Sequence, residues 1–114
     1  MLMVIKNLSK DTVISSNCGT ANTFIRRFLG LMGKAGLSHG QGLIITPCNS
    51  IHMFFMKFPI DAIFIDKNNK VLLVLENFKP WHISRIVFNA YSVIELPTGT
   101  IKATNTSIND ILQL

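Results

Sequence analysis

The chain has 114 residues, the size of a single domain that can bury a hydrophobic core without disulfides or metal ions. Hydrophobic residues make up 48% of the sequence and charged residues only 15%, which excludes a disordered chain. The formal net charge is +5, but the eleven basic residues are scattered, and only Arg26 and Arg27 are adjacent. The sequence therefore gives little support to nucleic-acid binding.

The same composition indicates a reducing compartment. Cys18 and Cys48 are the only cysteines, and their spacing does not suggest a disulfide framework. Lys57 and Asp61 interrupt the most apolar stretch, so no run of about 18 apolar residues is present. Residues 1–10 become polar too early for a signal peptide. We therefore expect a soluble, cytoplasmic protein with two reduced thiols and no membrane span.

The predicted elements begin with a pair of strands and a helix. Residues 1–7 and 12–18 predict two short strands that flank a polar turn. Residues 20–33 predict a short helix. Its apolar spacing leaves Arg26 and Arg27 mostly off the apolar face, which consists of Phe24, Phe28 and Leu31.

Four glycines follow within residues 33–42, and this segment is predicted to be a loop. Residues 43–47 and 50–55 then predict two strands on either side of a short turn. Residues 60–65 and 70–76 flank the sequence Asp-Lys-Asn-Asn, which is a strong signal for a β-hairpin.

The C-terminal part continues this pattern. Residues 90–96 predict a strand, residues 97–110 a turn with one helical turn, and residues 111–114 a terminal strand. Because the connections between strands are short, we expect a mainly antiparallel sheet that curls towards a barrel. The predicted fold class is α+β, a β-rich single domain over residues 1–114 with one or two short helices.

Residues 48–64 contain side chains of the kinds that bind metals. Thiol, imidazole and thioether groups suit copper(I) or zinc, and they come here from Cys48, His52, Met53 and Met56. In a strand, however, only His52 and Met56 would converge on one face. A closed zinc site needs four such ligands. We therefore expect neither a metal site nor a cofactor.

Asp61 stands among apolar residues after Pro59, so its carboxylate should be buried and bonded to backbone amides or to an arginine. A structural anchor is the first interpretation, and a general acid or base with a perturbed pKa is the second. His52 lies on a neighbouring predicted segment and could meet Asp61. A triad of Cys48, His52 and Asp61 matches no thiol-protease signature.

Several blocks of the sequence resemble the domain of unknown function 192 family. They are RRFLGLMGKAGL, GLIITPCNSIHMFFMKFPIDAIFID, NFKPW, AYSVIELPTG and INDILQL. The resemblance runs from about Arg26 to the C-terminus and implies the family's compact β-rich fold, but no reaction. One departure is Asn109 before Asp110, where the family usually carries Gly-Asp. Asn is the next-best residue for a left-handed conformation, so this turn should survive.

The resemblance also supplies candidate site residues. Its polar positions fall on Arg27, His52, Asp61, Glu95 and Asp110. They form either a ligand site or a buried polar network. Trp81, in a segment with polar neighbours, is added as a contact residue at the mouth of a pocket beside the glycine loop.

Three functions remain open. The leading one is a small binding module that holds a small ligand or a peptide at these polar residues. The second is an acid–base enzyme that uses His52 with Asp61 or Glu95. The third is an interaction protein that docks on an acidic partner or on nucleic acid, with binding that weakens steeply as salt increases.

Overall fold

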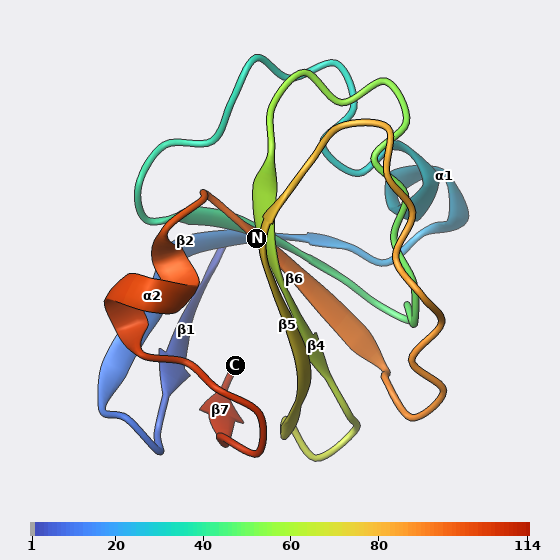
Figure 1. Cartoon of the computed structure of the whole chain (residues 1–114). Helices are drawn as coiled ribbons and strands as arrows, with labels where there is room; N and C mark the ends of the chain where they lie inside the picture. The colour runs from blue at the N-terminus through green and yellow to red at the C-terminus, as the bar shows by residue number, and fades with distance from the viewer. Residues whose placement is uncertain (1) are drawn as a thin grey trace.

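The structure is a computed structural model that describes residues 2–114. Within this range the chain forms a seven-stranded sheet in the order β5-β4-β6-β3-β2-β1-β7 (Figure 1). The strands are β1 (Met3–Asn7), β2 (Thr12–Ala21), β3 (Gln41–Ile45), β4 (Ile60–Ile65), β5 (Val71–Phe78), β6 (Ser92–Leu96) and β7 (Leu112–Gln113). Every neighbouring pair is antiparallel except β2 and β3, which are parallel. The predicted α+β fold with a mainly antiparallel sheet is confirmed.

The sheet curls so strongly that its two edge strands meet at one end (Figure 1). Lys70, just before β5, forms an antiparallel bridge with Ile111, just before β7. The amide of Val71 also donates to the carbonyl of Asp110 at 2.9 Å. The result is a half-barrel, as the short connections between strands predicted. The short helix α2 (Thr100–Thr104) lies against the barrel and contributes Ile101 to the core.

The central strands send alternate side chains into two hydrophobic clusters on opposite faces of the sheet. On β4, Ile63 and Ile65 enter the first cluster, whereas Ala62 and Phe64 enter the second. The same alternation on β6 places Ile94 and Leu96 in the first cluster and Val93 in the second. Glu95 therefore shares the face of Val93, beneath the long connections that cover the second cluster.

The strand predicted over residues 50–55 is wrong. This segment is irregular and retains only an isolated bridge between His52 and Ile83. Phe55 has a φ of 61°, and the amide of Met56 donates to the carbonyl of Met53 at 3.3 Å. Met53 and Met56 are both buried in the second cluster. Because a straight strand would send residues three apart to opposite faces, burying both requires a turn.

The predicted helix is shorter than residues 20–33. Helix α1 (Phe24–Leu29) begins after Thr23, whose hydroxyl accepts from the Arg26 amide at 3.2 Å, and ends at Gly30. None of its residues is buried. The expected apolar face is therefore not a core face: Leu31 is buried beyond the helix end, but Phe24 and Phe28 are exposed. No helix within residues 2–114 has the length and apolar character needed to cross a membrane.

Candidate functional site

The structure divides the six candidate residues between a pocket and other places. Arg27, His52 and Glu95 line the same pocket. The remaining three do not line it, and they are Asp61, Trp81 and Asp110. The polar positions are thus neither one site nor one buried network.

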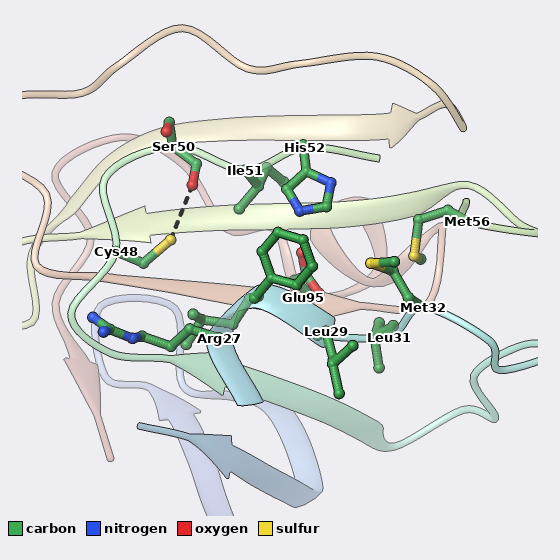
Figure 2. Close-up of a pocket in the computed structure, with 13 residues that line it drawn as sticks. Arg27, Leu29, Leu31, Met32, Cys48, Ser50, Ile51, His52, Met56 and Glu95 are labelled. Atoms are coloured by element: carbon green, nitrogen blue, oxygen red, sulfur yellow. Dashed lines mark hydrogen bonds between the residues drawn. The ribbon is translucent and has the colours of Figure 1, made fainter. Parts of the chain in front are cut away.

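The pocket lies between α1, the segment of residues 46–56 and the outer face of β6. Figure 2 shows Arg27, Cys48 and His52 around it and Glu95 rising from β6. Its volume of about 40 Å³ has room for about one or two water-sized groups. We call this volume the inner pocket. Its walls are largely apolar and include Leu31, Met32, Ile45, Ile51 and Met56.

A wider depression adjoins the inner pocket and opens to the surface. This outer pocket has a volume of about 290 Å³ and adds Phe24, Pro47 and Asn49 to the lining. Six residues line both volumes, so the two form a single cleft with a narrow base. The shared residues are Arg27, Phe28, Ile45, Cys48, Ser50 and His52.

Glu95 is the buried acidic group of this cleft. Its alternation with Ile94 and Leu96 on β6 directs the side chain out of the barrel core and towards α1. No residue within the described range donates a hydrogen bond to its carboxyl group, and burial raises the pKa of Glu95 to about 8. The carboxyl group is therefore mostly protonated at neutral pH.

The charges of Glu95 and Arg27 act on the pKa of the Cys48 thiol in opposite directions. Burial raises the pKa of Cys48, the charge of Glu95 raises it further, and the charge of Arg27 opposes the rise. The thiol donates to the carbonyl of Ser50 at 3.0 Å (Figure 2). A protonated, hydrogen-bonded thiol is a poor nucleophile, so the arrangement does not favour thiol catalysis.

Arg27 and His52 occupy the mouth of the cleft. The Nη1 atom of Arg27 donates to the carbonyl of Pro47 at 3.2 Å, which leaves other guanidinium donors for a ligand. His52 Nδ1 accepts from the Phe54 amide at 3.3 Å. A neutral imidazole that accepts at Nδ1 carries its proton on Nε2, so His52 also presents a donor.

Asp61 is fully buried, as predicted from its apolar neighbours. Its Oδ1 atom accepts from the Asn77 amide at 2.9 Å, and Oδ2 accepts from the Ile101 amide at 3.0 Å. Both carboxylate oxygens thus bind the backbone, one near the end of β5 and one in α2. This bonding pattern is that of a structural anchor, and Asp61 does not line the pocket that contains His52.

Asp110 belongs to a different polar cluster at the closed end of the barrel. Its carboxylate accepts from Lys10 Nζ, Asn7 Nδ2 and the Ser107 amide, each at 2.9 Å. Burial alone would raise its pKa, but these donors and the charge of Lys10 lower the pKa of Asp110 overall. The preceding Asn109 has a φ of 77°, so asparagine adopts the left-handed conformation as expected.

Trp81 is exposed at 58% of its surface, in agreement with the expectation of an accessible position. Its ring packs edge-on against Phe55 and also near Phe54, with centroid distances of 5.0 and 6.1 Å. The expected position at the mouth of a pocket beside the glycine loop is wrong, because Trp81 lines neither the cleft nor the pocket beside residues 33–42.

Sequence analysis did not assign Phe28 to a pocket. The ring of Phe28 lies 5.9 Å from that of His52 and lines both parts of the cleft. Gly30 ends α1 with a φ of 49°, a conformation that favours glycine. Phe28 stands in the block RRFLGLMG, so the resemblance marked the segment without revealing this role, whereas a glycine is the residue type expected at the end of a helix.

Comparisons with known proteins agree with the resemblance. The family model DUF192, described as an uncharacterized ACR, matches residues 5–114. A UPF0127 protein of Thermococcus sibiricus is 36% identical over 108 residues, which cover 91% of this chain and 70% of the relative. A UPF0127 protein of Pyrococcus horikoshii is 38% identical over 101 residues, or 84% of this chain and 85% of the relative.

Two crystal structures share the fold. One is a protein of unknown function from Novosphingobium aromaticivorans, with a TM-score of 0.83, 20% identity and coverage of 97% of this chain and 82% of the other. The second is a Sinorhizobium meliloti protein described as a candidate transcription regulator, with a TM-score of 0.81, 22% identity and coverage of 96% and 89%. With the family match over nearly the whole sequence, the chain belongs to the DUF192 family of uncharacterized proteins.

Proposed function

We propose that this protein is a small binding module whose cleft holds a ligand by an amino group. The observation that carries the proposal is Glu95, a buried carboxyl group in a pocket to which no described residue donates a hydrogen bond. Glu95 is only 4% exposed, yet no fully enclosed side-chain nitrogen or oxygen among the described residues lacks a hydrogen-bond partner, so its carboxyl group is open to the pocket. A ligand that brings a donor to this position would supply the hydrogen bond that the protein does not.

The size and lining of the cleft favour an amino group at the base. An ammonium or primary amine is about as large as a water molecule, which the 40 Å³ inner pocket accommodates. Its hydrogens would be directed at Glu95, and the first carbons of the ligand would contact the apolar walls. The 290 Å³ outer pocket leaves room for the rest of a small molecule.

The mouth of the cleft favours an acceptor at the other end of the ligand. Arg27 and His52 both present hydrogen-bond donors there. A carboxylate or carbonyl group that reached the mouth would therefore be matched. Free amino acids and the amino ends of peptides combine these two features, an amino group and a nearby oxygen acceptor.

Binding should be linked to proton release. The empty pocket holds Glu95 mostly protonated at neutral pH, because burial raises its pKa to about 8. A bound ammonium group stabilises the carboxylate and lowers that pKa. Affinity should therefore rise between pH 6 and about pH 8 as the cost of deprotonating Glu95 falls.

The test is calorimetric titration with methylammonium, glycine and triglycine as probes, each in two buffers of different ionisation enthalpy. We expect saturable binding of at least one probe, with proton release at pH 7, and loss of that binding in Glu95→Gln. Glu76→Gln, which alters an exposed carboxylate on β5, is the matched control and should bind normally. Binding of glycine but not of triglycine would indicate that the ligand is a free amino acid. Binding of triglycine but not of glycine would indicate that the ligand is the amino end of a peptide. Absence of binding by every probe, or equal binding by Glu95→Gln, would refute the proposal.

A second candidate is acid–base catalysis, because Glu95 and His52 line one pocket and burial raises the pKa of Glu95 to about 8. A carboxylic acid that stays protonated near neutral pH can serve as a general acid. The structure gives no such support to Asp61, whose oxygens both accept from backbone amides. Mass spectrometry of a bound probe after incubation separates the two candidates. A binding module returns the probe unchanged, whereas an enzyme converts it and Glu95→Gln abolishes the conversion.

A further inference from the structure

We propose that an exposed aromatic surface, which begins at the rim of the cleft with Phe24, Phe28 and Leu29 and extends away from it, docks on an anionic lipid bilayer. We call this surface the aromatic stripe, and it comprises Phe24, Ile25, Phe28, Leu29, Phe54, Phe55, Trp81 and Ile83. Phe24 is exposed at 75% and Phe55 at 64%. So many exposed large apolar side chains on neighbouring segments indicate a surface that meets an apolar partner.

The stripe is continuous from α1 to the segment of residues 81–83. Ring centroids follow one another at 5.9 Å from Phe28 to His52, 5.2 Å from His52 to Phe54 and 6.1 Å from Phe54 to Trp81. Ile83 joins this series through its bridge with His52. Figure 1 shows α1, the connection between β3 and β4, and the connection between β5 and β6 side by side at one side of the half-barrel.

The backbone holds the exposed rings in place. Phe55 and Trp81 have φ values of 61° and 70°, a region that bulky side chains rarely occupy. The Trp81 amide donates to the carbonyl of Met53 at 2.7 Å, and the Met53 amide donates to the carbonyl of His82 at 2.7 Å. The first bond holds Trp81 in its unfavourable conformation, and both bonds tie residues 81–82 to Met53, two residues before Phe55. Such strained conformations are typical of functional positions.

The helix presents an apolar face outward as well. Phe24, Ile25, Phe28 and Leu29 have the spacing of one helix face, and all four are exposed. A helix that packed this face on the core would bury it. In α1 this face is exposed instead, so it is free to contact the apolar interior of a membrane.

The charges around the stripe are positive. Residues 22–60 and 77–94 contain no aspartate or glutamate, and their basic residues are Arg26, Arg27, Lys34, Lys57, Lys79 and Arg85. Of the acidic residues that border these segments in sequence, Asp61 and Glu95 are buried, and Glu76 on β5 is exposed. The stripe is therefore an apolar surface in a basic setting, which complements anionic headgroups above an apolar phase.

Two other occupants fit these features less well. A second copy of the chain would place two basic surfaces against each other. Nucleic acid would suit the basic residues, but the aliphatic side chains of Ile25, Leu29 and Ile83 would have no apolar partner on it. A bilayer interface accommodates tryptophan and phenylalanine at headgroup depth and aliphatic side chains below them.

Trp81 is the only tryptophan and lies within the stripe, so its fluorescence reports contact directly. The experiment mixes the full chain with vesicles of phosphatidylcholine containing phosphatidylglycerol, or of phosphatidylcholine alone, and follows emission and co-sedimentation. We expect a blue shift and sedimentation with the anionic vesicles, weakening as salt is added. Phosphatidylcholine alone should bind much less.

Matched variants test the residues of the stripe. Phe55→Asn removes a ring at a φ that asparagine tolerates, and it should lower partitioning by about tenfold or more. Phe88→Asn is the control, because Phe88 is exposed at 87% but is not part of the stripe. Lys57→Gln with Lys79→Gln should weaken binding, whereas Lys102→Gln on α2 should not.

Two results with vesicles would overturn the proposal: no blue shift or sedimentation with anionic vesicles, or equal partitioning of Phe55→Asn and Phe88→Asn. Two results without lipid would also overturn it. They are salt-sensitive binding to a single-stranded oligonucleotide in place of vesicles, and a concentration-dependent dimer that buries Trp81. Normal probe binding in the cleft of Phe55→Asn would show that a loss of lipid binding is not a loss of the pocket.

Discussion

The Oε1 atom of Glu95 lies against the backbone of Gly30, only 3.7 Å from the point that a Cβ atom on Gly30 would occupy. A side chain of β6 and the residue that ends α1 thus meet at the base of the cleft. The position of α1 relative to the sheet determines how much space surrounds the carboxyl group. A substitution at either residue should therefore alter the environment of the other.

Gly30→Ala should destabilise the protein, because Gly30 has a φ of 49° and a ψ of −122°, a region unfavourable for any residue with a side chain. We expect a loss on the order of 1–3 kcal/mol in the free energy of unfolding, measured by urea denaturation. Gly33 has a φ of 82° and open space around it, so Gly33→Ala measures the cost of a positive φ without any steric contact. Gly36→Ala, without strain or close neighbours, should be nearly neutral. A neutral Gly30→Ala would contradict the strain argument.

Burial of Glu95 should make stability fall as pH rises. Its pKa is raised from 4.5 to about 8, so between these values the folded state binds a proton that the unfolded state has lost. The contribution of Glu95 to the free energy of unfolding is complete below about pH 4.5 and is lost by about pH 8. Between these values the free energy of unfolding falls by up to about 1.4 kcal/mol per pH unit. Glu95→Gln should remove this slope in denaturation measured from pH 5 to 9. Glu76→Gln should retain it, and identical slopes in both variants would contradict the assignment.

Asp61→Ala should destabilise the protein, because two backbone amides lose their acceptor. Leaving a buried donor unsatisfied costs on the order of 1–3 kcal/mol. Thermal and urea denaturation would measure the loss. Amide hydrogen exchange should also accelerate at Ile101 and Asn77 before the rest of the core. An unchanged melting midpoint would show that the anchor contributes nothing.

The cluster around Asp110 should give the opposite pH dependence from Glu95. Burial raises the pKa of Asp110, but bonds from Asn7, Lys10 and Ser107 lower it overall, so the folded state favours the carboxylate. Its contribution to stability is present above the ordinary pKa of 3.8 and is lost as pH falls through the lower folded value. Asp110→Asn should therefore be less stable than the parent at pH 6, and the difference should shrink during acid titration. A difference that grows towards low pH would contradict this.

Trp81 should emit at long wavelength in the absence of lipid, because its side chain is largely exposed. Acrylamide should quench it readily. Phe55→Asn should increase the quenching, since the Phe55 ring covers one edge of the indole at a centroid distance of 5.0 Å. A blue-shifted emission that resists acrylamide would place the indole in a buried environment and contradict the structure.

Local sequence determined most of the sheet. The β-rich run of residues 60–65 and the turn residues after it are local features of the chain, and they form β4 and its hairpin with β5 as predicted. The apolar neighbours of Asp61 likewise foretold its burial, because a carboxylate in such a run must find donors.

Only the tertiary structure decided the cleft and the stripe. Residues 50–55 have the pattern of a strand, but packing Met53 and Met56 on one cluster bends the segment and turns Phe54 and Phe55 outward. Helix α1 has an apolar face that local spacing assigns to the core, yet the irregular segments already cover the sheet beneath it. Arg27, His52 and Glu95 meet because the curled sheet brings distant segments together, and Asp61 and Asp110 bind elsewhere. Such contacts depend on the path of the whole chain, which no local pattern specifies.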